Sequence, residues 1–322
     1  DPVRFPTLLR NPGSLSRVLF ISGVSNGELA DLTIANGNIN GHGAGIYIGN
    51  STNLLITGCA LTNNESLDAV TYGFGGGIYA SNSCGTIRNC RFERNSARSI
   101  PAGYRNYGGG LYTTGGAWRI ENTVFFYNRT RASGSSSLAY GGGLYLDGGD
   151  HVLKNCLVVQ NESRGPADTV SDSKGDGIYH AGGSLLVDAC TLAGNIGEGI
   201  RGYSGTIVTN SILWQNRDDI TGAVVLAVSM IGNGDSAGTN GCYAADPLFE
   251  YGFYLADGSP CTNAGTITAA EAGLDGRTTR TDGTPDADAI DLGYHYATGK
   301  DPAYADLYVI PGNSDTNSGT NW

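Results

Sequence analysis

Two columns of residues recur along most of this chain, and they constrain its fold more than any other feature. In the first column a Gly is followed by Ile or Leu and then by Tyr, at steps of about 33 residues. In the second column a Cys, Ser or Thr precedes an Asn by five residues, and its steps track those of the first column. The tyrosines of the first column are Tyr47, Tyr79, Tyr112, Tyr145 and Tyr179. The asparagines of the second column are Asn64, Asn95, Asn128, Asn161, Asn195 and Asn216.

Between these columns the chain shows short strands with alternating apolar and polar residues, and no stretch with a useful helical period. One such repeat cannot bury its own apolar side, so it needs identical neighbours above and below. The pattern predicts an all-β chain, a parallel β-helix (solenoid) of about seven coils with an irregular C-terminal cap. Equivalent residues then lie about 4.8 Å apart, and the Asn column becomes a ladder of side-chain amides.

Four of the long steps carry extra residues after the Asn, and these insertions must leave the solenoid at the same corner. Insertions that gather on one side of a solenoid often build its binding surface. We expect four stacked loops at residues 65–74, 96–107, 129–140 and 162–174.

The repeat also divides the chain into parts. Residues 1–28 are expected to form an N-terminal coil with its first strand, and residues 29–240 the parallel β-helix. Residues 241–300 break the pattern and are expected to form a capping appendage, because a bare solenoid end exposes strand edges. Residues 301–322 form a separate C-terminal tail.

Composition narrows the class of partner. The net charge is -11, which argues against nucleic acid as a partner because phosphates need a basic surface. The 51 glycines lack the three-residue period of collagen and indicate a chain full of tight turns. No apolar run reaches the roughly 18 residues needed to span a bilayer.

The C-terminal part carries a resemblance to a known family, in residues 242–249, residues 259–265 and the run Asp291-Leu292-Gly293-Tyr294-His295-Tyr296. With the coil pattern, these segments resemble the pectate-lyase-like superfamily of right-handed parallel β-helices. They look most like bacterial secreted proteins of the choice-of-anchor and polymorphic outer-membrane types. The resemblance covers residues 29–300 and implies a right-handed helix on a protein that is secreted or at the cell surface, in a bacterium. It implies no particular activity.

The tail from Leu307 to Trp322 resembles the opening segment of the same kind of β-helix, although here it follows the last coil. Two interpretations stay open. The chain is a window from a larger protein with tandem modules, or the tail completes the first coils of a neighbouring copy. Both imply a linear array, and head-to-tail contacts of this kind build filaments.

Charged and aromatic residues near the insertions are the candidate binding groups. Solvated loop charge is the plain interpretation of the arginines, and recognition of an acidic sugar or a partner is the alternative. Cross-strand stacking explains the tyrosines, with sugar binding or lateral packing as alternatives. The candidates are Arg98, Arg105, Arg129, Arg131, Arg164, Tyr79, Tyr112 and Tyr145.

A dense run of carboxylates and seven cysteines supply the remaining candidates. Asp282, Asp286, Asp288 and Asp291 could hold a structural Ca²⁺, or form a solvated acidic turn. Cys242 and Cys261 are expected to form a disulfide that staples the cap. Cys59 with Cys90, and Cys156 with Cys190, would lie in adjacent coils, either bridged or as buried thiols.

Two functions follow. The first is a non-catalytic extracellular structural or adhesive module, arranged head to tail with copies of itself. The second is a β-helix that binds or degrades a polysaccharide, with its site among the four insertions. Gly41-His42-Gly43 is similar to a short polygalacturonase motif, but the acidic and basic partners that those enzymes need are missing. We therefore name no catalytic residue.

Overall fold

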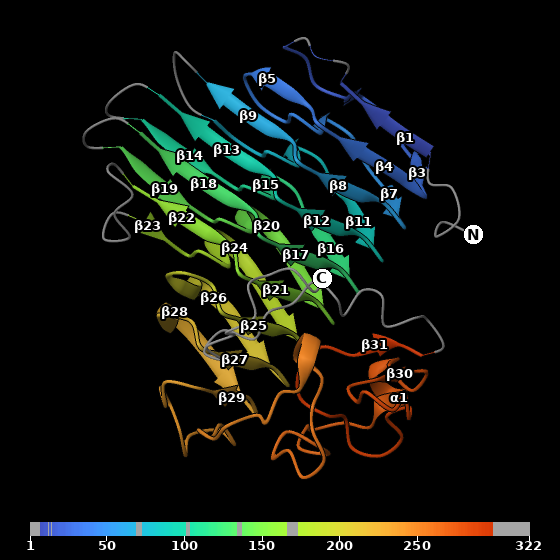
Figure 1. The fold of residues 1–322 in the computed structure, drawn as a ribbon, viewed down its shortest axis with the longest axis vertical. Helices are drawn as coiled ribbons and strands as arrows, with labels where there is room; N and C mark the ends of the chain where they lie inside the picture. The colour runs from blue at the N-terminus through green and yellow to red at the C-terminus, as the bar shows by residue number, and fades with distance from the viewer. Residues whose placement is uncertain are drawn as a thin grey trace, which may run out of the picture.

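The computed structural model describes residues 7–11, 13, 15–68, 73–100, 104–133, 137–165 and 173–298. The tail at 301–322 and the tips of the four insertions lie outside these residues. Figure 1 shows the described part as a stack of coils that runs from the N-terminal strands down to β29, as the repeat predicts. The fold is a right-handed parallel β-helix, so the predicted fold class is confirmed.

One wall of the solenoid is a nine-stranded parallel sheet, and its strands mark the levels of the stack. The seven expected coils correspond to β4 through β27, with one further level at each end. The strands, in spatial order, are β1 (Thr7–Arg10), β4 (Leu32–Ala35), β8 (Ala60–Thr62), β12 (Arg91–Glu93), β17 (Val124–Phe126), β21 (Leu157–Val159), β25 (Thr191–Ala193), β27 (Ile212–Trp214) and β29 (Met230–Ile231).

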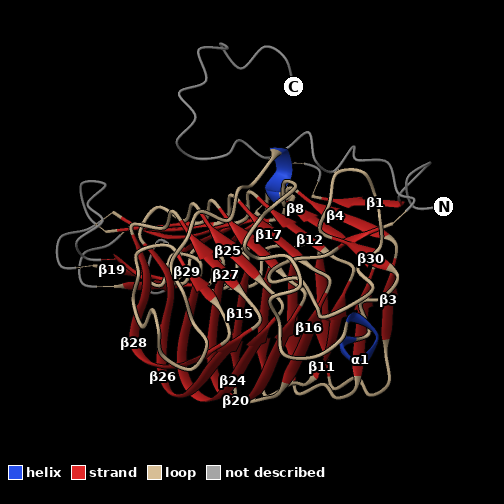
Figure 2. Cartoon of the chain, turned by 90° about the horizontal axis from the view of Figure 1, so that it is seen from below, coloured by secondary structure: helices blue, strands red, loops and turns tan. Residues whose placement is uncertain are grey.

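The opposite wall is a twelve-stranded sheet made of two files that merge partway down. In the upper coils each file has its own strands: β2 (Leu19–Ser22), β6 (Ile46–Gly49), β10 (Ile78–Ser81) and β15 (Leu111–Thr114), then β3 (Glu28–Ala30), β7 (Leu54–Thr57), β11 (Gly85–Arg88) and β16 (Trp118–Glu121). In the lower coils single long strands span both files: β20 (Leu144–Lys154), β24 (Ile178–Asp188), β26 (Glu198–Thr209) and β28 (Asp218–Ala227). Figure 2 shows these long strands curving along the base of the molecule.

The four insertions are strands for much of their length, so the expectation of loops was wrong. Each leaves the solenoid as one strand, and three of them return as a second strand. We call this two-layered side wall the flange. Its outgoing layer is β5 (Asn38–Asn40), β9 (Glu65–Asp68), β13 (Ser96–Ser99), β18 (Arg129–Ala132) and β22 (Glu162–Arg164). Its returning layer is β14 (Arg105–Tyr107), β19 (Leu138–Tyr140) and β23 (Ser173–Lys174).

Small side chains fill the space between the two layers of the flange, and this is why the layers lie close together. They alternate with outward residues along each strand, as the two-residue period of a strand requires. Asn106 links the layers, because its amide nitrogen donates to the Ser99 hydroxyl at 2.9 Å and to the Arg131 carbonyl at 3.0 Å. The buried residues are Ser66, Ala97, Ser99, Asn106, Thr130, Ala132, Ser137, Ala139 and Ser163.

The solenoid core consists of inward residues that stack on their own equivalents. Phe92 and Phe125 stack with ring centroids 4.6 Å apart, and Leu61 continues the same file. A second file joins Ile46, Ile78, Leu111, Leu144, Ile178 and Ile200. All of these side chains are fully buried, which supplies the main stabilisation that a single coil lacks.

Residues 241–298, which we call the flank segment, lie mainly along the outer face of the nine-stranded sheet. Figure 1 shows the segment beside the lower coils, on the side away from the flange. Its regular elements are η2 (Tyr251–Phe253), α1 (Ala269–Ala272), β30 (Arg277–Thr278) and β31 (Tyr296–Ala297). Phe253, Tyr254, Tyr294 and Tyr296 pack there against Phe126, Leu157, Val159 and Ala193. No helix in the described ranges is long and apolar enough to cross a membrane.

Candidate functional site

The six asparagines of the second column form one buried file. Each side-chain nitrogen donates to the side-chain oxygen of the next Asn, as from Asn95 to Asn128 at 2.9 Å and from Asn128 to Asn161 at 3.1 Å. The backbone nitrogen of each Asn donates to the same oxygen. The members are Asn64, Asn95, Asn128, Asn161, Asn195 and Asn216.

The file has a distinct beginning and end. At the upper end the amide of Gly37 donates to the Asn64 oxygen at 2.9 Å. At the lower end the Asn216 nitrogen donates to Asp219 at 2.8 Å, and the other carboxylate oxygen of Asp219 accepts from the amide of Asn233 at 2.9 Å. Asp219 therefore closes the ladder with an acceptor. Burial raises its pKa above the ordinary value.

The tyrosines of the first column also stack in one file, with a second aromatic file beside them. Tyr79 and Tyr112 lie 5.3 Å apart between ring centroids, with planes at 4°, and Tyr145 and Tyr179 lie 5.0 Å apart. The second file is Phe74, Tyr107 and Tyr140, each of which directly precedes a run of three glycines. Tyr112 is only 8% exposed, so the ring at the centre of the file is buried.

Stacking decides what these rings can offer to a ligand. A sugar ring packs on the face of an aromatic ring, but here each inner face already lies against the next tyrosine. The ring of His42 is held in the same way, 4.7 Å from Phe74 and 5.1 Å from Tyr79. Burial raises the pKa of Tyr179 to about 12, so its hydroxyl stays protonated at neutral pH. The arrangement favours a structural role for the aromatic files over sugar stacking.

The five candidate arginines divide between the two layers of the flange. Arg98, Arg131 and Arg164 are in register on β13, β18 and β22 of the outgoing layer. Arg129 begins β18 in the neighbouring column, beside Ser96 and Glu162. Arg105 belongs to β14 of the returning layer. The structure therefore brings three of the five into one straight file.

Two acidic side chains close the lower edge of the flange, where the next strand is missing. Asp176 accepts hydrogen bonds from the amides of Ser163 at 2.7 Å and Glu198 at 3.2 Å. Glu198 accepts one from the amide of Gly175 at 2.7 Å and pairs with Arg201. These carboxylates replace the carbonyls of an absent strand. Burial raises the pKa of Asp176 to about 7.

The four aspartates proposed as calcium ligands do not converge on one point. Asp282 is exposed and pairs with Arg280 at 3.0 Å, and Asp288 is exposed as well. Asp286 is buried against His295, with 2.9 Å between its carboxylate and the imidazole Nε2. Asp291 accepts from the amide of Asn263 at 2.7 Å and from the Thr279 hydroxyl. In the ranges that the structure describes, no three His, Cys, Asp or Glu residues are placed to hold a metal.

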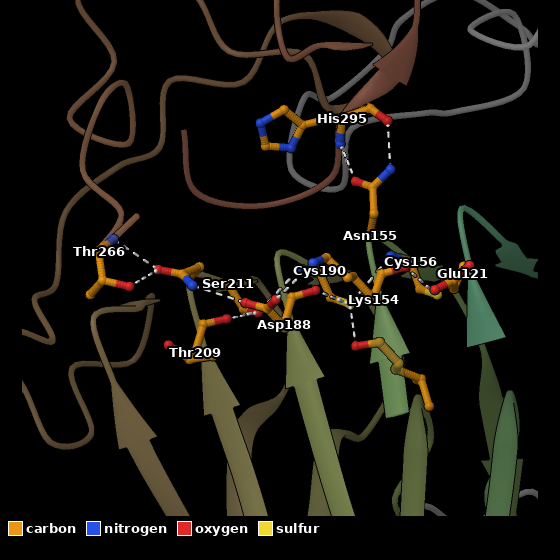
Figure 3. Close-up of polar contacts among 12 residues, drawn as sticks. Glu121, Lys154, Asn155, Cys156, Asp188, Cys190, Thr209, Ser211, Thr266 and His295 are labelled. Atoms are coloured by element: carbon orange, nitrogen blue, oxygen red, sulfur yellow. Dashed lines mark hydrogen bonds and ion pairs between the residues drawn. The ribbon is translucent and has the colours of Figure 1, made fainter. Parts of the chain in front are cut away.

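Two turn asparagines hold the flank segment on the solenoid. Figure 3 shows Asn155 paired with the backbone of His295: its oxygen accepts from the His295 amide at 2.6 Å and its nitrogen donates to the His295 carbonyl at 2.9 Å. Asn210 accepts from the amide and the hydroxyl of Thr266, each at 3.2 Å. The amide of Gly293 donates to the Asn210 carbonyl at 3.0 Å.

The seven cysteines are free, so the expected disulfide between Cys242 and Cys261 is not formed, and the other two pairs are buried thiols. Cys242 lies in the solenoid core, whereas Cys261 lies in the cluster between the flank segment and the nine-stranded sheet. In-register neighbours stack about 4.8 Å apart, which exceeds the Cβ separation that a disulfide accepts. The thiols of Cys59 with Cys90, and of Cys156 with Cys190, instead donate to backbone carbonyls, as from Cys90 to Arg88 at 3.2 Å.

Sequence reasoning missed several of these groups. Asp176 replaces the middle Gly of the glycine run, and that substitution could have indicated the end of the flange. Phe74, Tyr107 and Tyr140 precede the same run at steps of 33 residues, which could have indicated a second aromatic column. The His295–Asp286 pair joins residues outside the repeat, so no pattern announces it.

Comparison with known proteins agrees with this architecture. A family model described as "Right handed beta helix region" matches residues 17–211. Neither the curated proteins nor the solved structures contain a match to the chain. The family match spans more than half of the chain and includes the asparagine file from Asn64 to Asn195. The chain belongs to the family of proteins with a right-handed β-helix region.

Proposed function

We propose that the chain is a non-catalytic extracellular structural module that joins copies of itself head to tail. The observation that carries this proposal is the N-terminal end of the stack. In the described part of the chain β1, β2 and β3 each have a strand neighbour on one side only. Leu8, Leu15 and Phe20 are 51%, 69% and 61% exposed at this end. Open edges with apolar side chains are a template for another chain.

The opposite end offers a matching surface. β28 is the last strand of the twelve-stranded sheet, and β26 is its one described neighbour. The open strands β2 and β3 and the last strand β28 belong to the same twelve-stranded sheet. All strands of this sheet are parallel, so a second copy can continue the stack without a change of direction. Such a contact is heterologous and therefore open-ended.

The buried aspartate and histidine side chains support a non-catalytic role. Asp176 and Asp219 terminate sheets and ladders, and His295 with Asp286 stabilises the flank segment. Burial lowers the pKa of His151 to about 4, and its Nδ1 accepts from the amide of Trp118 at 3.3 Å. Each of these groups is occupied by a structural contact. The acidic composition and the resemblance of residues 242–296 support an extracellular location.

The test measures self-association of the full chain by light scattering over a wide range of concentration. We expect the mass to rise with concentration for the wild type, and Phe20→Lys to prevent this by placing a charge on the edge strand β2. Val225→Lys, on β28 and 57% exposed in the wild type, should prevent it as well. Tyr251→Lys, at a 50% exposed residue of the flank segment, is the matched control and should associate normally.

Mixing the two variants identifies the direction of assembly. Phe20→Lys leaves the C-terminal end intact and Val225→Lys leaves the N-terminal end intact, so a mixture should yield dimers and nothing larger. Monomeric wild type at every concentration would refute self-association. Dimers of Val225→Lys alone would show that N-terminal ends meet each other, which contradicts head-to-tail growth.

A further inference from the structure

The stacked tyrosines form a continuous file of oxidisable rings along the solenoid. Successive rings of this tyrosine file lie between 5.0 Å and 5.3 Å apart, measured between centroids. Tyr107 of the second aromatic file joins it 4.5 Å from Tyr145, and Tyr140 joins it beside the last ring. Electron transfer weakens steeply with distance, so rings in contact exchange an electron readily. The members of the tyrosine file are Tyr47, Tyr79, Tyr112, Tyr145 and Tyr179.

The upper end of the tyrosine file is unfavourable for an oxidised ring. The ring above Tyr47 is Phe20, at 4.9 Å, and phenylalanine is much harder to oxidise than tyrosine. The guanidinium of Arg17 lies 5.1 Å from the centre of the Tyr47 ring. Its positive charge repels the positive charge that loss of an electron leaves on a ring. Oxidation is therefore not retained at the N-terminal end of the file.

The centre of the file holds its phenolic protons firmly. Burial raises the pKa of Tyr112 and of Tyr145 above the ordinary value. A phenol loses an electron most easily when its proton leaves as well, and a buried site of low dielectric disfavours that proton loss. A radical is therefore not trapped at the buried centre and passes to rings from which a proton can leave.

The lower end of the file opens to water at Tyr203. This residue is 53% exposed, and its phenol interacts directly with that of Tyr179. Arg201 lies beside Tyr179 on the neighbouring strand, but its charge is neutralised by Glu198, which accepts from the Arg201 Nε atom at 2.7 Å. The Tyr203 phenol can release its proton to water. The radical of an oxidised file is therefore most stable on this residue.

We propose that the tyrosine file is a radical relay and that Tyr203 is the residue at which oxidation joins two chains through a dityrosine bond. A one-electron oxidant of the peroxidase type takes one electron from each chain, and each phenol releases one proton to water. The two Tyr203 radicals form one carbon–carbon bond between their ortho positions, and the hydrogens displaced from these carbons return to the phenol oxygens. The two electrons and two protons reduce one hydrogen peroxide to two waters. This modification does not depend on head-to-tail assembly.

The experiment oxidises the full chain with a haem peroxidase and hydrogen peroxide, and mass spectrometry identifies the cross-linked peptides. Tyr127 is the internal comparison, because it is 46% exposed and its ring contacts Phe126, which does not relay oxidation. We expect Tyr203 to form several-fold more dityrosine than Tyr127. Equal yields would show that exposure alone selects the residue and would overturn the proposal, as would cross-links found mainly at Tyr251, which is 50% exposed in the flank segment.

Two variants test the relay itself. Tyr203→Phe should lose most of the cross-linked dimer, whereas the matched control Tyr127→Phe should cross-link as the wild type does. Tyr179→Phe keeps a stacked ring but removes the oxidisable phenol next to Tyr203, so the yield at Tyr203 should fall several-fold, to the level of Tyr127. An unchanged yield at Tyr203 in this variant would overturn the relay.

The fold and the assembly are controlled separately. The Tm of each variant before oxidation, compared with that of the wild type, shows that the fold is kept. The comparison of Tyr203 with Tyr127 in the wild type needs no variant, so it decides the proposal even where a variant fails to fold. Phe20→Lys, which blocks self-association, should keep the preference for Tyr203. Loss of the preference in Phe20→Lys would overturn a relay within the single chain.

Discussion

At the scale of single residues, the buried amides of this protein have one orientation from end to end. Every Asn of the file accepts at its oxygen from the coil above and donates to the coil below. A file with a single direction must begin at a donor and end at an acceptor. Gly37 supplies the donor and Asp219 the acceptor, and the second carboxylate oxygen of Asp219 accepts from the amide of Asn233.

Asp176, which closes the lower edge of the flange, makes the stability of the protein depend on pH. Its pKa in the folded chain is about 7, above the ordinary 3.8, because burial disfavours the charged carboxylate. Its contribution to stability is therefore complete below pH 3.8 and is lost as the pH rises through 7. Between pH 5 and pH 7 the free energy of unfolding should fall by roughly 2 kcal/mol from this residue. Denaturant unfolding at these two pH values measures the change.

Asp176→Asn supplies the comparison, because an amide does not titrate. The pKa of Asp219 is also raised by burial and contributes in the same direction, so the wild type and the variant must be compared at both pH values. We expect the variant to show a smaller fall in stability. An identical fall in both proteins would contradict a titrating Asp176.

At the scale of elements, the solenoid was predictable and its additions were not. Two repeat columns gave the stacking and the file of asparagines, because a strict spacing forces equivalent residues over one another. The flange was predicted as loops, since its strands are short and hold Ser, Ala and Thr at inward positions where an apolar signal is expected. The position of the flank segment was not predictable, because its contacts join residues 140 apart, such as Asn155 and His295.

At this scale, a change at Asn155 tests how the flank segment is held on the solenoid. Replacing it with Ala removes two hydrogen bonds to the backbone of His295 and leaves that amide unsatisfied, while the carbonyl keeps its hydrogen bond from Arg277 at 3.2 Å. We expect a loss of about 2 kcal/mol in local stability. Hydrogen exchange should therefore accelerate in residues 290–297, while the upper coils keep their protection.

The matched control is Asn122→Ala, one coil above. Asn122 accepts from the Asn155 side chain at 2.9 Å and, within the described ranges, makes no hydrogen bond to the flank segment. Its replacement should leave exchange in residues 290–297 close to that of the wild type. Equal acceleration in both variants would mean that the linked side chains of Asn122 and Asn155 together, and not Asn155 alone, hold the segment.

At the scale of the whole molecule, the flank segment packs on the lower half of the stack more than on the upper half. The flank segment packs against β17, β21, β25, β27 and β29, through residues that include Leu157, Ala193 and Ile212. The apolar clusters that join the flank segment to this sheet include no residue of β1, β4, β8 or β12. Because each coil contacts only its neighbours, stability in a solenoid is close to a sum of local terms and can differ along the stack.

Amide protection should therefore decrease from the lower coils toward the N-terminal end. Leu61 and Leu192 form a matched pair, since both belong to the same inward file and both are fully buried. Native-state hydrogen exchange of Phe20→Lys, which keeps the N-terminal end uncovered, should show stronger protection at Leu192 than at Leu61. Adding Asn155→Ala should reduce that difference by loosening the cover. Equal protection at the two leucines would show that the stack unfolds as one unit and that the flank segment adds little to its stability.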